Sequence, residues 1–348
     1  MTVKTTQRSA PGKIILCGEH SVVYGRPAIA IPISDMRSYA TVSPFPAGAC
    51  TAPEPPSSGT NGCVPIGAPA GTGLRICAPD LQQECRLVDT TPDHPLGRLV
   101  RLVLAELQSP EPDAILTVSS DLPIASGMGS GASTTVAAAR ALSAALGEEL
   151  PPARISAITY EVEKIHHGTP SGIDNTVISW ERPVYFVKGE TPETFTIHTP
   201  FRLLIANSGI AGSTKEAIDE VRRRRTATPG YYDIVFDCIG AIARGARAAV
   251  EQGAVHALGT LMNENHELLV KMGVSLVQLD RLVAAAREAG ALGAKLTGSG
   301  QGGNIIALVE EETSPPVREA LLRAGATTVW ETNVCAPTGV CPAPTPEA

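Results

Sequence analysis

The chain has 348 residues, of which 43% are hydrophobic and 18% charged, and a net charge of −7. This length favours two domains, and the negative charge argues against a nucleic-acid partner, because binding a phosphate backbone needs a basic surface. No apolar run reaches the ~20 residues that cross a bilayer, and residues 1–12 lack an apolar signal-peptide core. We therefore expect a cytoplasmic protein with no membrane partner.

The first part of the chain predicts a sheet with an interruption. Short β-prone runs occur at residues 14–17, 28–33 and 38–45. Residues 46–73 are then rich in Pro, Gly, Ser and Thr, which predicts a loop or an elaborated insertion. Residues 96–107 have helical spacing of their apolar side chains, and residues 114–119 predict another strand.

A glycine-rich turn over residues 123–132 separates that strand from the next helix. The helix, residues 133–146, is rich in alanine and ends at Gly147. A further helix begins at Pro151 and Pro152, with one apolar face formed by Ile155, Ile158, Val162 and Ile165. We expect it to end in a tight loop over residues 168–172.

The composition changes near residue 190, where we place a domain boundary. Beyond it we expect strands at residues 202–206, 294–296, 304–309 and 327–331 and helices at residues 215–225, 233–252, 256–272 and 276–289. Since strands and helices alternate in both parts, the class is mixed α and β. The predicted organisation is an N-terminal domain (1–190), a C-terminal domain (191–333) and a Pro-rich tail (334–348).

The glycine-rich turn has the features of a phosphate cradle. The segment Asp121-Leu-Pro-Ile-Ala-Ser-Gly-Met-Gly-Ser-Gly-Ala-Ser133 follows a predicted strand and opens a predicted helix. Backbone N–H groups and the helix dipole favour a bound phosphate at such a place, and hydroxyls such as those of Ser130 and Ser133 can contact phosphate or Mg²⁺. The alternative is a tight strand-to-helix connection without a ligand. No lysine follows the glycines and no acidic residue lies at the ribose position, which excludes a Walker A loop and a Rossmann fingerprint.

Two other segments carry a family resemblance when they are read with this loop. They are Ala10-Pro-Gly-Lys-Ile-Ile-Leu-Cys-Gly-Glu-His-Ser-Val-Val-Tyr-Gly25 and Gly293-Ala-Lys-Leu-Thr-Gly-Ser-Gly-Gln-Gly-Gly303. Their order and spacing resemble the GHMP kinases, and residues 18–25 are similar to the mevalonate kinases among them. The stretches at residues 167–175 and 262–273 agree with this resemblance, which extends over residues 8–332.

The resemblance implies a fold and a reaction. The fold is α+β with two domains, the N-terminal one like the second domain of ribosomal protein S5 and the C-terminal one ferredoxin-like. The reaction is transfer of phosphate from ATP, with Mg²⁺, to the 5-hydroxyl of (R)-mevalonate in isoprenoid biosynthesis, and the family often forms homodimers. Two alternatives stay open: another GHMP kinase acceptor, such as phosphomevalonate, a sugar or a different hydroxyl of mevalonate, and a non-catalytic sensor of ATP and a metabolite.

The resemblance also implies roles for individual residues. Asp174 is the implied catalytic base and Lys13 the implied cation beside it, which stabilises negative charge during phosphoryl transfer. Glu163 is the implied Mg²⁺ ligand. Without the resemblance, Asp174 is equally well a turn residue, Lys13 a solvated lysine at a strand end, and Glu163 an exposed helical residue.

The other implied site residues divide between the nucleotide and the acceptor. The nucleotide contacts are Pro123, Gly127, Met128, Gly129, Ser130, Gly131, Ala132 and Ser133. The acceptor contacts are Lys13, Glu19, His20, Asp174, Thr214 and Gly298. The family loop has a second serine that contacts Mg²⁺ where this chain has Gly131, so we expect Ser130 or a water in its place.

Four consecutive arginines, residues 222–225, form the strongest charge cluster in the chain. We expect them to form the solvated end of a helix. The alternative is that they attract anionic substrates into a nearby site.

Overall fold

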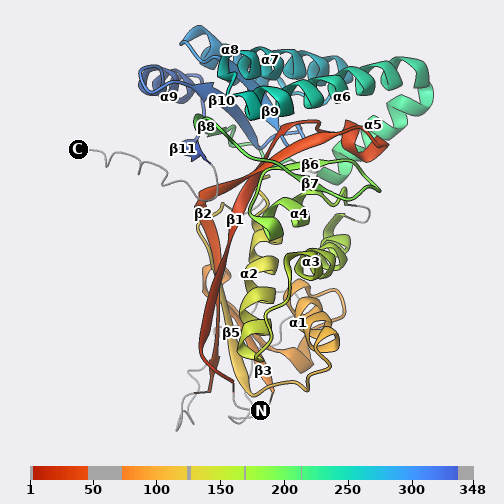
Figure 1. Cartoon of the computed structure of the whole chain (residues 1–348), viewed down its shortest axis with the longest axis vertical. Helices are drawn as coiled ribbons and strands as arrows, with labels where there is room; N and C mark the ends of the chain where they lie inside the picture. Colours follow the sequence, from red (N-terminus) through yellow and green to blue (C-terminus); the bar gives the residue numbers. More distant parts are fainter. Residues whose placement is uncertain (1–2, 46–72, 124–126, 168–169, 213, 336–348) are drawn as a thin grey trace.

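A computed structural model describes residues 3–45, 73–123, 127–167, 170–212 and 214–335. The predicted insertion, apart from Gly73, and the tail from residue 336 onward lie outside the described residues. Two sheets with packed helices form the described part of the chain (Figure 1). No helix in these ranges has the length and apolar character needed to cross a membrane.

The first sheet is built on two long antiparallel strands, β1 (Thr6–Cys17) and β2 (Ala28–Pro44). Its strand order is β4-β3-β5-β2-β6-β7, with β1 also paired to β2. The other strands are β3 (Leu74–Ala78), β4 (Gln83–Arg86), β5 (Ala114–Ser120), β6 (Val184–Phe186) and β7 (Glu193–Thr194).

The strand β2 corrects one prediction, because the expected strands at 28–33 and 38–45 are a single strand. Pairing with β1 shifts from Pro11 opposite Arg37 to Gly12 opposite Ile33. The intervening residues therefore form a bulge, which bends a strand without ending it.

Four α-helices accompany the first sheet: α1 (Pro95–Glu106), α2 (Ser130–Ala145), α3 (Pro152–His167) and α4 (Ile173–Trp180). Short 3₁₀ helices are η1 (Ser21–Tyr24), η2 (Pro79–Leu81) and η3 (Leu87–Asp89). Helix α2 packs on β1 and β2 through fully buried alanines, whose small side chains let the helix lie close to the sheet (Figure 1). The predicted tight loop after α3 gives way to α4 at Ile173, so Asp174 lies on a helix rather than in a loop.

The second sheet is antiparallel, with the order β11-β8-β10-β9. Its strands are β8 (Phe201–Asn207), β9 (Gly293–Thr297), β10 (Asn304–Val309) and β11 (Thr328–Val334). The accompanying helices are α5 (Thr214–Ala227), α6 (Pro229–Gln252), α7 (Val255–Met272), α8 (Val277–Glu288) and α9 (Ser314–Arg323). Two sheets with their own helices confirm the predicted α+β class.

Strand β1 is buried on both faces. All residues from Ala10 to Cys17 are buried, although side chains alternate between the two faces of a strand. Ile15 points into the core shared with α2, whereas Ile14 and Leu16 belong to a cluster that includes residues of β8 and α6. The C-terminal part of β1, from Ala10 onward, therefore belongs to the packing of both halves, and its C-terminal end lies at the junction between them.

Candidate active site

A pocket of about 560 Å³ lies between the two halves of the described chain. The first half contributes the glycine-rich loop, α3, α4 and the turn after β1, and the second half contributes α5 and the turn after β9. The lining includes these predicted site residues: Glu19, His20, Gly127, Gly129, Ser130, Gly131, Ala132, Glu163, Asp174, Thr214 and Gly298. Residues from distant motifs are therefore brought to one cavity.

Four predicted residues are not on the pocket lining: Lys13, Pro123, Met128 and Ser133. Met128 is fully buried, and its carbonyl accepts the backbone N–H of Lys13 at 2.9 Å. Ser133 is also fully buried, and its hydroxyl donates to the carbonyl of Ala10 at 2.8 Å. Met128 joins the loop to β1, and Ser133 joins the start of α2 to β1. The assignment of Pro123, Met128 and Ser133 to the nucleotide stays a prediction.

The loop before α2 is shaped by glycines with positive φ. Gly127 has φ 80° and Gly129, which precedes the helix, has φ 76°. A Cβ atom on Gly129 would lie 3.0 Å from Cγ of Lys13 and 3.1 Å from Cδ1 of Ile178, so a side chain there meets both strain and crowding. No described side chain caps the start of α2, and its first N–H groups can therefore bind an anion in the pocket.

Lys13 and Asp174 form an ion pair at the pocket wall. The distance from Nζ of Lys13 to Oδ1 of Asp174 is 3.1 Å. Lys13 is only 4% exposed, whereas the side chain of Asp174 keeps 32% of its surface and reaches the pocket. Asp174 lies in the first turn of α4, where the helix dipole favours a carboxylate. The ammonium thus lies directly behind the exposed carboxylate.

Glu163 reaches the same wall from α3. Burial, and next the negative charge of Asp174, raise the pKa of Glu163 to about 7, while Lys13 acts in the opposite direction. A Cβ atom on Gly131 would lie 3.7 Å from Oε1 of Glu163, so this carboxyl group faces the start of α2. The departure at Gly131 therefore removes a hydroxyl from a position next to Glu163.

The turn after β1 presents Glu19 and His20 to the pocket. Burial lowers the pKa of His20 to about 4, with the carbonyl of Ser299 acting in the opposite direction, so the ring is neutral at physiological pH. Nε2 of His20 lies 2.9 Å from that carbonyl, to which it donates as a neutral ring. Glu19 forms a buried ion pair with Lys295 of β9.

Sequence reasoning missed Lys295 and Lys215. Lys295 lies in the short strand β9, between apolar neighbours. A charged residue in an otherwise apolar strand is the sequence feature that could have indicated it. Lys215 lies in the first turn of α5 and lines the pocket. Its signal is its position beside Thr214, which the resemblance had already assigned to the acceptor.

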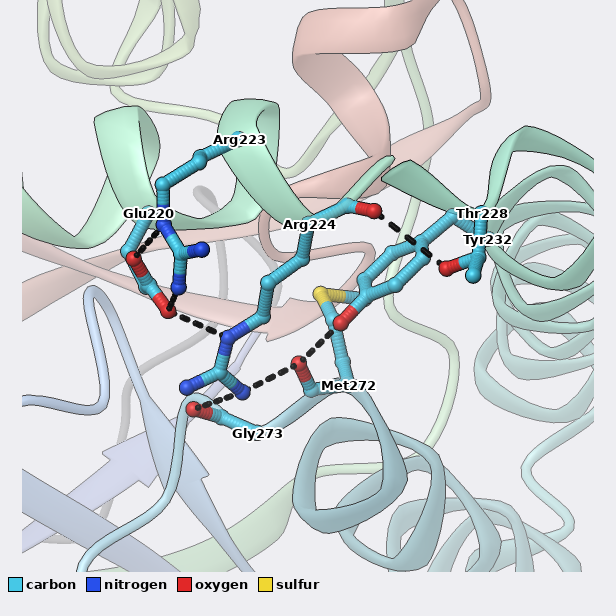
Figure 2. Close-up of polar contacts among 7 residues, drawn as sticks. All are labelled: Glu220, Arg223, Arg224, Thr228, Tyr232, Met272 and Gly273. Carbon is cyan, nitrogen blue, oxygen red and sulfur yellow. Dashed lines mark hydrogen bonds and ion pairs between the residues drawn. The ribbon is translucent and has the colours of Figure 1, made fainter. Parts of the chain in front are cut away.

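The arginine run at residues 222–225 does not point a free charge cluster at the pocket. Each arginine forms an ion pair with an acidic side chain: Arg222 with Asp219, Arg223 and Arg224 with Glu220, and Arg225 with Asp233. Arg224 also donates to the carbonyls of Met272 (3.4 Å) and Gly273 (3.3 Å), and the hydroxyl of Tyr232 donates to Met272 at 3.0 Å (Figure 2). The run therefore fastens α5 to the end of α7, which favours a structural role over attraction of substrate.

Comparison with known proteins agrees with this arrangement. The pattern of the GHMP kinases N terminal domain matches residues 96–181, and that of the GHMP kinases C terminal domain matches residues 246–327. A mevalonate kinase of Thermococcus sibiricus is 33% identical over 88% of this chain and 90% of that protein. One from Aeropyrum pernix is 34% identical over the same shares. The structure of L. major mevalonate kinase in complex with R-mevalonate superposes with a TM-score of 0.76 at 26% identity, covering 97% of this chain and 98% of that one. This chain therefore belongs to the mevalonate kinase family of the GHMP kinases.

Proposed function

We propose that the protein is an ATP-dependent mevalonate kinase, which transfers the γ-phosphoryl group of ATP to the 5-hydroxyl of (R)-mevalonate. The observation that carries this proposal is the ion pair of Lys13 and Asp174 on a pocket that also contains a glycine-rich helix start, which no described side chain caps. Such a pocket offers a proton acceptor, a cation and a phosphate cradle, which are what phosphoryl transfer needs from a protein.

Each of these groups has a step in the proposed reaction. Asp174 accepts the proton of the attacking hydroxyl. Lys13, 3.1 Å from Asp174, holds that carboxylate in place and stabilises negative charge on the oxygen that loses its proton. The N–H groups at the start of α2 bind the phosphate oxygens, so the γ-phosphorus faces the acceptor.

The carboxyl groups also fit a magnesium ion. Among the described residues no group of three or more His, Cys, Asp or Glu side chains is arranged to hold a metal. A magnesium ion bound to a nucleotide needs fewer protein ligands, because it uses one or two protein carboxylates together with phosphate oxygens and water. Glu163 fits as a ligand because a cation would stabilise its ionised form against burial and against Asp174, and Ser130 supplies a nearby hydroxyl. The ion would neutralise charge on the phosphates.

Lys215 is proposed as the counter-charge for the acceptor. Mevalonate is a carboxylate, and a carboxylate in a partly buried pocket needs a cation or hydrogen-bond donors. Lys215 is the one lysine or arginine among the described residues that line the pocket. The predicted homodimer and the predicted cytoplasmic location stay predictions.

The test is release of ADP from Mg-ATP with mevalonate, phosphomevalonate, galactose or homoserine as the acceptor. We expect turnover with mevalonate alone, loss of turnover in Asp174→Asn, and wild-type turnover in the control Asp93→Asn, which changes an exposed aspartate. In Lys215→Met the KM for mevalonate should rise while that for ATP does not. Turnover with another acceptor would retain the kinase and overturn the substrate, and ATP binding without turnover would indicate a sensor.

A further inference from the structure

We propose that Lys295 is a positioning residue for the acceptor side of the pocket, acting through Glu19 and the turn that carries His20. The inference rests on the proposed kinase function, but its melting-temperature and hydrogen-exchange measurements do not depend on turnover. Lys295 is not on the pocket lining, whereas Glu19 and His20 are. Its side chain therefore acts on the substrate through residues that line the pocket, and its ion-pair partner Glu19 is one of them.

The ion pair between Lys295 and Glu19 is buried to an unusual degree. The two side chains are 0% and 1% exposed. Nζ of Lys295 also donates to the carbonyl of Leu296 at 2.6 Å, while Oε2 of Glu19 has no hydrogen-bond partner among the described residues. Removing two charges from water is costly, and well-packed apolar residues often serve a fold equally well. Stability alone thus gives a poor reason for this pair.

The location of the pair gives a better reason. Lys295 lies on β9 in the second half of the molecule, and Glu19 follows β1 in the first half. Thr297 of the same strand donates to the carbonyl of Ile15 at 2.9 Å and accepts its N–H at 3.2 Å. Next along the chain, the carbonyl of Ser299 bonds His20. One strand and its turn therefore hold the end of β1 at three successive points.

The turn that is held in this way is strained. His20 has φ 60° and ψ −45°, which is close to the conformation of the classic γ-turn and is rare and strained for a residue with a side chain. The N–H of Ser21 bonds the carbonyl of Glu19 at 2.6 Å and closes a three-residue turn. Such a conformation persists only where its surroundings hold it. Lys295 anchors the residue before His20, and Ser299 anchors His20 itself.

The first test is the kinetics of Lys295→Met. Without its anchor the turn relaxes and His20 shifts, so the KM for mevalonate should rise between about tenfold and about 100-fold, while the KM for ATP stays at its wild-type value. Two controls separate this from general damage. Leu321→Ala opens a cavity in the core beside α9, and Thr332→Val removes another contact between the halves, to Asp35 at 2.8 Å. Neither control should raise the KM for mevalonate.

The second test removes both charges, in Lys295→Met/Glu19→Gln. Lys295→Met alone leaves a buried carboxyl group faced by Lys13 and Cys17 of β1. Burial already raises the pKa of Glu19, and loss of Lys295 raises it further. The melting temperature of Lys295→Met should therefore fall more steeply than that of the wild type as the pH rises from 5 to 8. The double variant should lose this extra pH dependence of the melting temperature and keep the high KM for mevalonate. If the pH dependence and the KM both returned to their wild-type values, the role of Lys295 would be purely structural.

The third test is hydrogen exchange of the backbone over residues 18–25, measured without substrate. We expect faster exchange in Lys295→Met and in the double variant than in the wild type, and no change in Thr332→Val. If the wild type does not phosphorylate mevalonate, the proposed function fails and this arm still tests the anchor. Unchanged exchange, or an unchanged KM in an active enzyme, would overturn the positioning role.

Discussion

Glu163 and Asp174 are two carboxyl groups on one pocket wall, and their surroundings give them different chemistry. Asp174 is partly exposed and has the ammonium of Lys13 at 3.1 Å. Glu163 is 7% exposed, and its pKa is raised to about 7 by burial and by Asp174. Paired acidic groups whose environments differ in this way usually divide their roles. Here Asp174 suits proton transfer, and Glu163 suits a cation that compensates for its burial.

The substitution Glu163→Gln tests this division. It retains the shape of the side chain and removes the charge, so stabilisation of the phosphates by a cation should weaken, with a loss of about 100-fold in turnover. A titration with MgCl₂ should also show that the variant needs more magnesium for half-maximal activity. The matched control is Glu161→Gln on the same helix, where the side chain of Glu161 is 40% exposed and pairs with Lys164 at 2.6 Å. Equal magnesium curves for both variants would contradict the role of Glu163.

Single residues were predictable from sequence where a motif contains them. Gly127, the residues from Gly129 to Ala132, Asp174 and Glu163 line the pocket that the motifs led us to expect, whereas Met128 of the same loop is buried behind it. Lys295 was missed because its partner Glu19 is 276 residues away along the chain, and no local pattern reports that distance. The positive φ of His20 was hidden for a related reason, since contacts from the other half of the chain hold it.

Elements were predictable where they are long and periodic. Helices α6 and α7 appear within a few residues of their expected bounds, because their apolar side chains repeat with a helical period. Helix α4 has only 8 residues, between Gly172 and Glu181. It is too short to show a clear helical period, so the sequence does not predict it. The bulge in β2 interrupts the β pattern of the sequence in the same way as a gap between two strands, so the sequence predicts two strands where the structure has one.

Helix α7 contributes a buried histidine whose charge state predicts a pH effect. His266 accepts the N–H of Leu296 through Nδ1 at 3.3 Å, and its Nε2 lies 3.3 Å from Oδ1 of Asp280 on α8. Burial, and next the positive charge of Arg287, lower the pKa of His266 to about 4, while Asp280 acts in the opposite direction and Lys295 lowers it further. The folded protein therefore holds this ring neutral.

This histidine should destabilise the fold in acid. In the unfolded chain the pKa returns to its usual value near 6.5, so the unfolded state binds more protons between pH 6.5 and pH 4. The free energy of unfolding should fall over that range, by on the order of 3 kcal/mol from this group. His266→Gln should flatten the profile in urea melts at a series of pH values. His256→Gln, at an exposed position on the same helix, should leave the slope unchanged, and an equal slope for His266→Gln would contradict the argument.

At the scale of the whole molecule, the expected two-part organisation has a feature that the sequence did not indicate. Each half has its own hydrophobic core, and a third hydrophobic cluster connects the two halves. The first half contributes Ile14, Leu16 and Ile31 to this cluster, and the second half contributes Leu203 and Ile306. Along β1 the side chains alternate between the two faces of the strand, and both faces are equally apolar. The sequence therefore does not show which face packs against which half of the molecule. The pocket lies across this junction, which means that its geometry depends on the two halves staying together.

The shared cluster predicts that both halves unfold together. The chain has two tryptophans, Trp180 on α4 and Trp330 on β11, one in each half. In Trp180→Phe and Trp330→Phe variants, the remaining tryptophan reports one half, and the two urea transitions should coincide. Leu16→Ala, which removes a fully buried side chain from the shared cluster, should cost about 2 to 5 kcal/mol and move both transitions by the same amount. Transitions that separate, or a shift in only one of them, would show that each half is stabilised by its own core, and the pocket would then open without unfolding of either half.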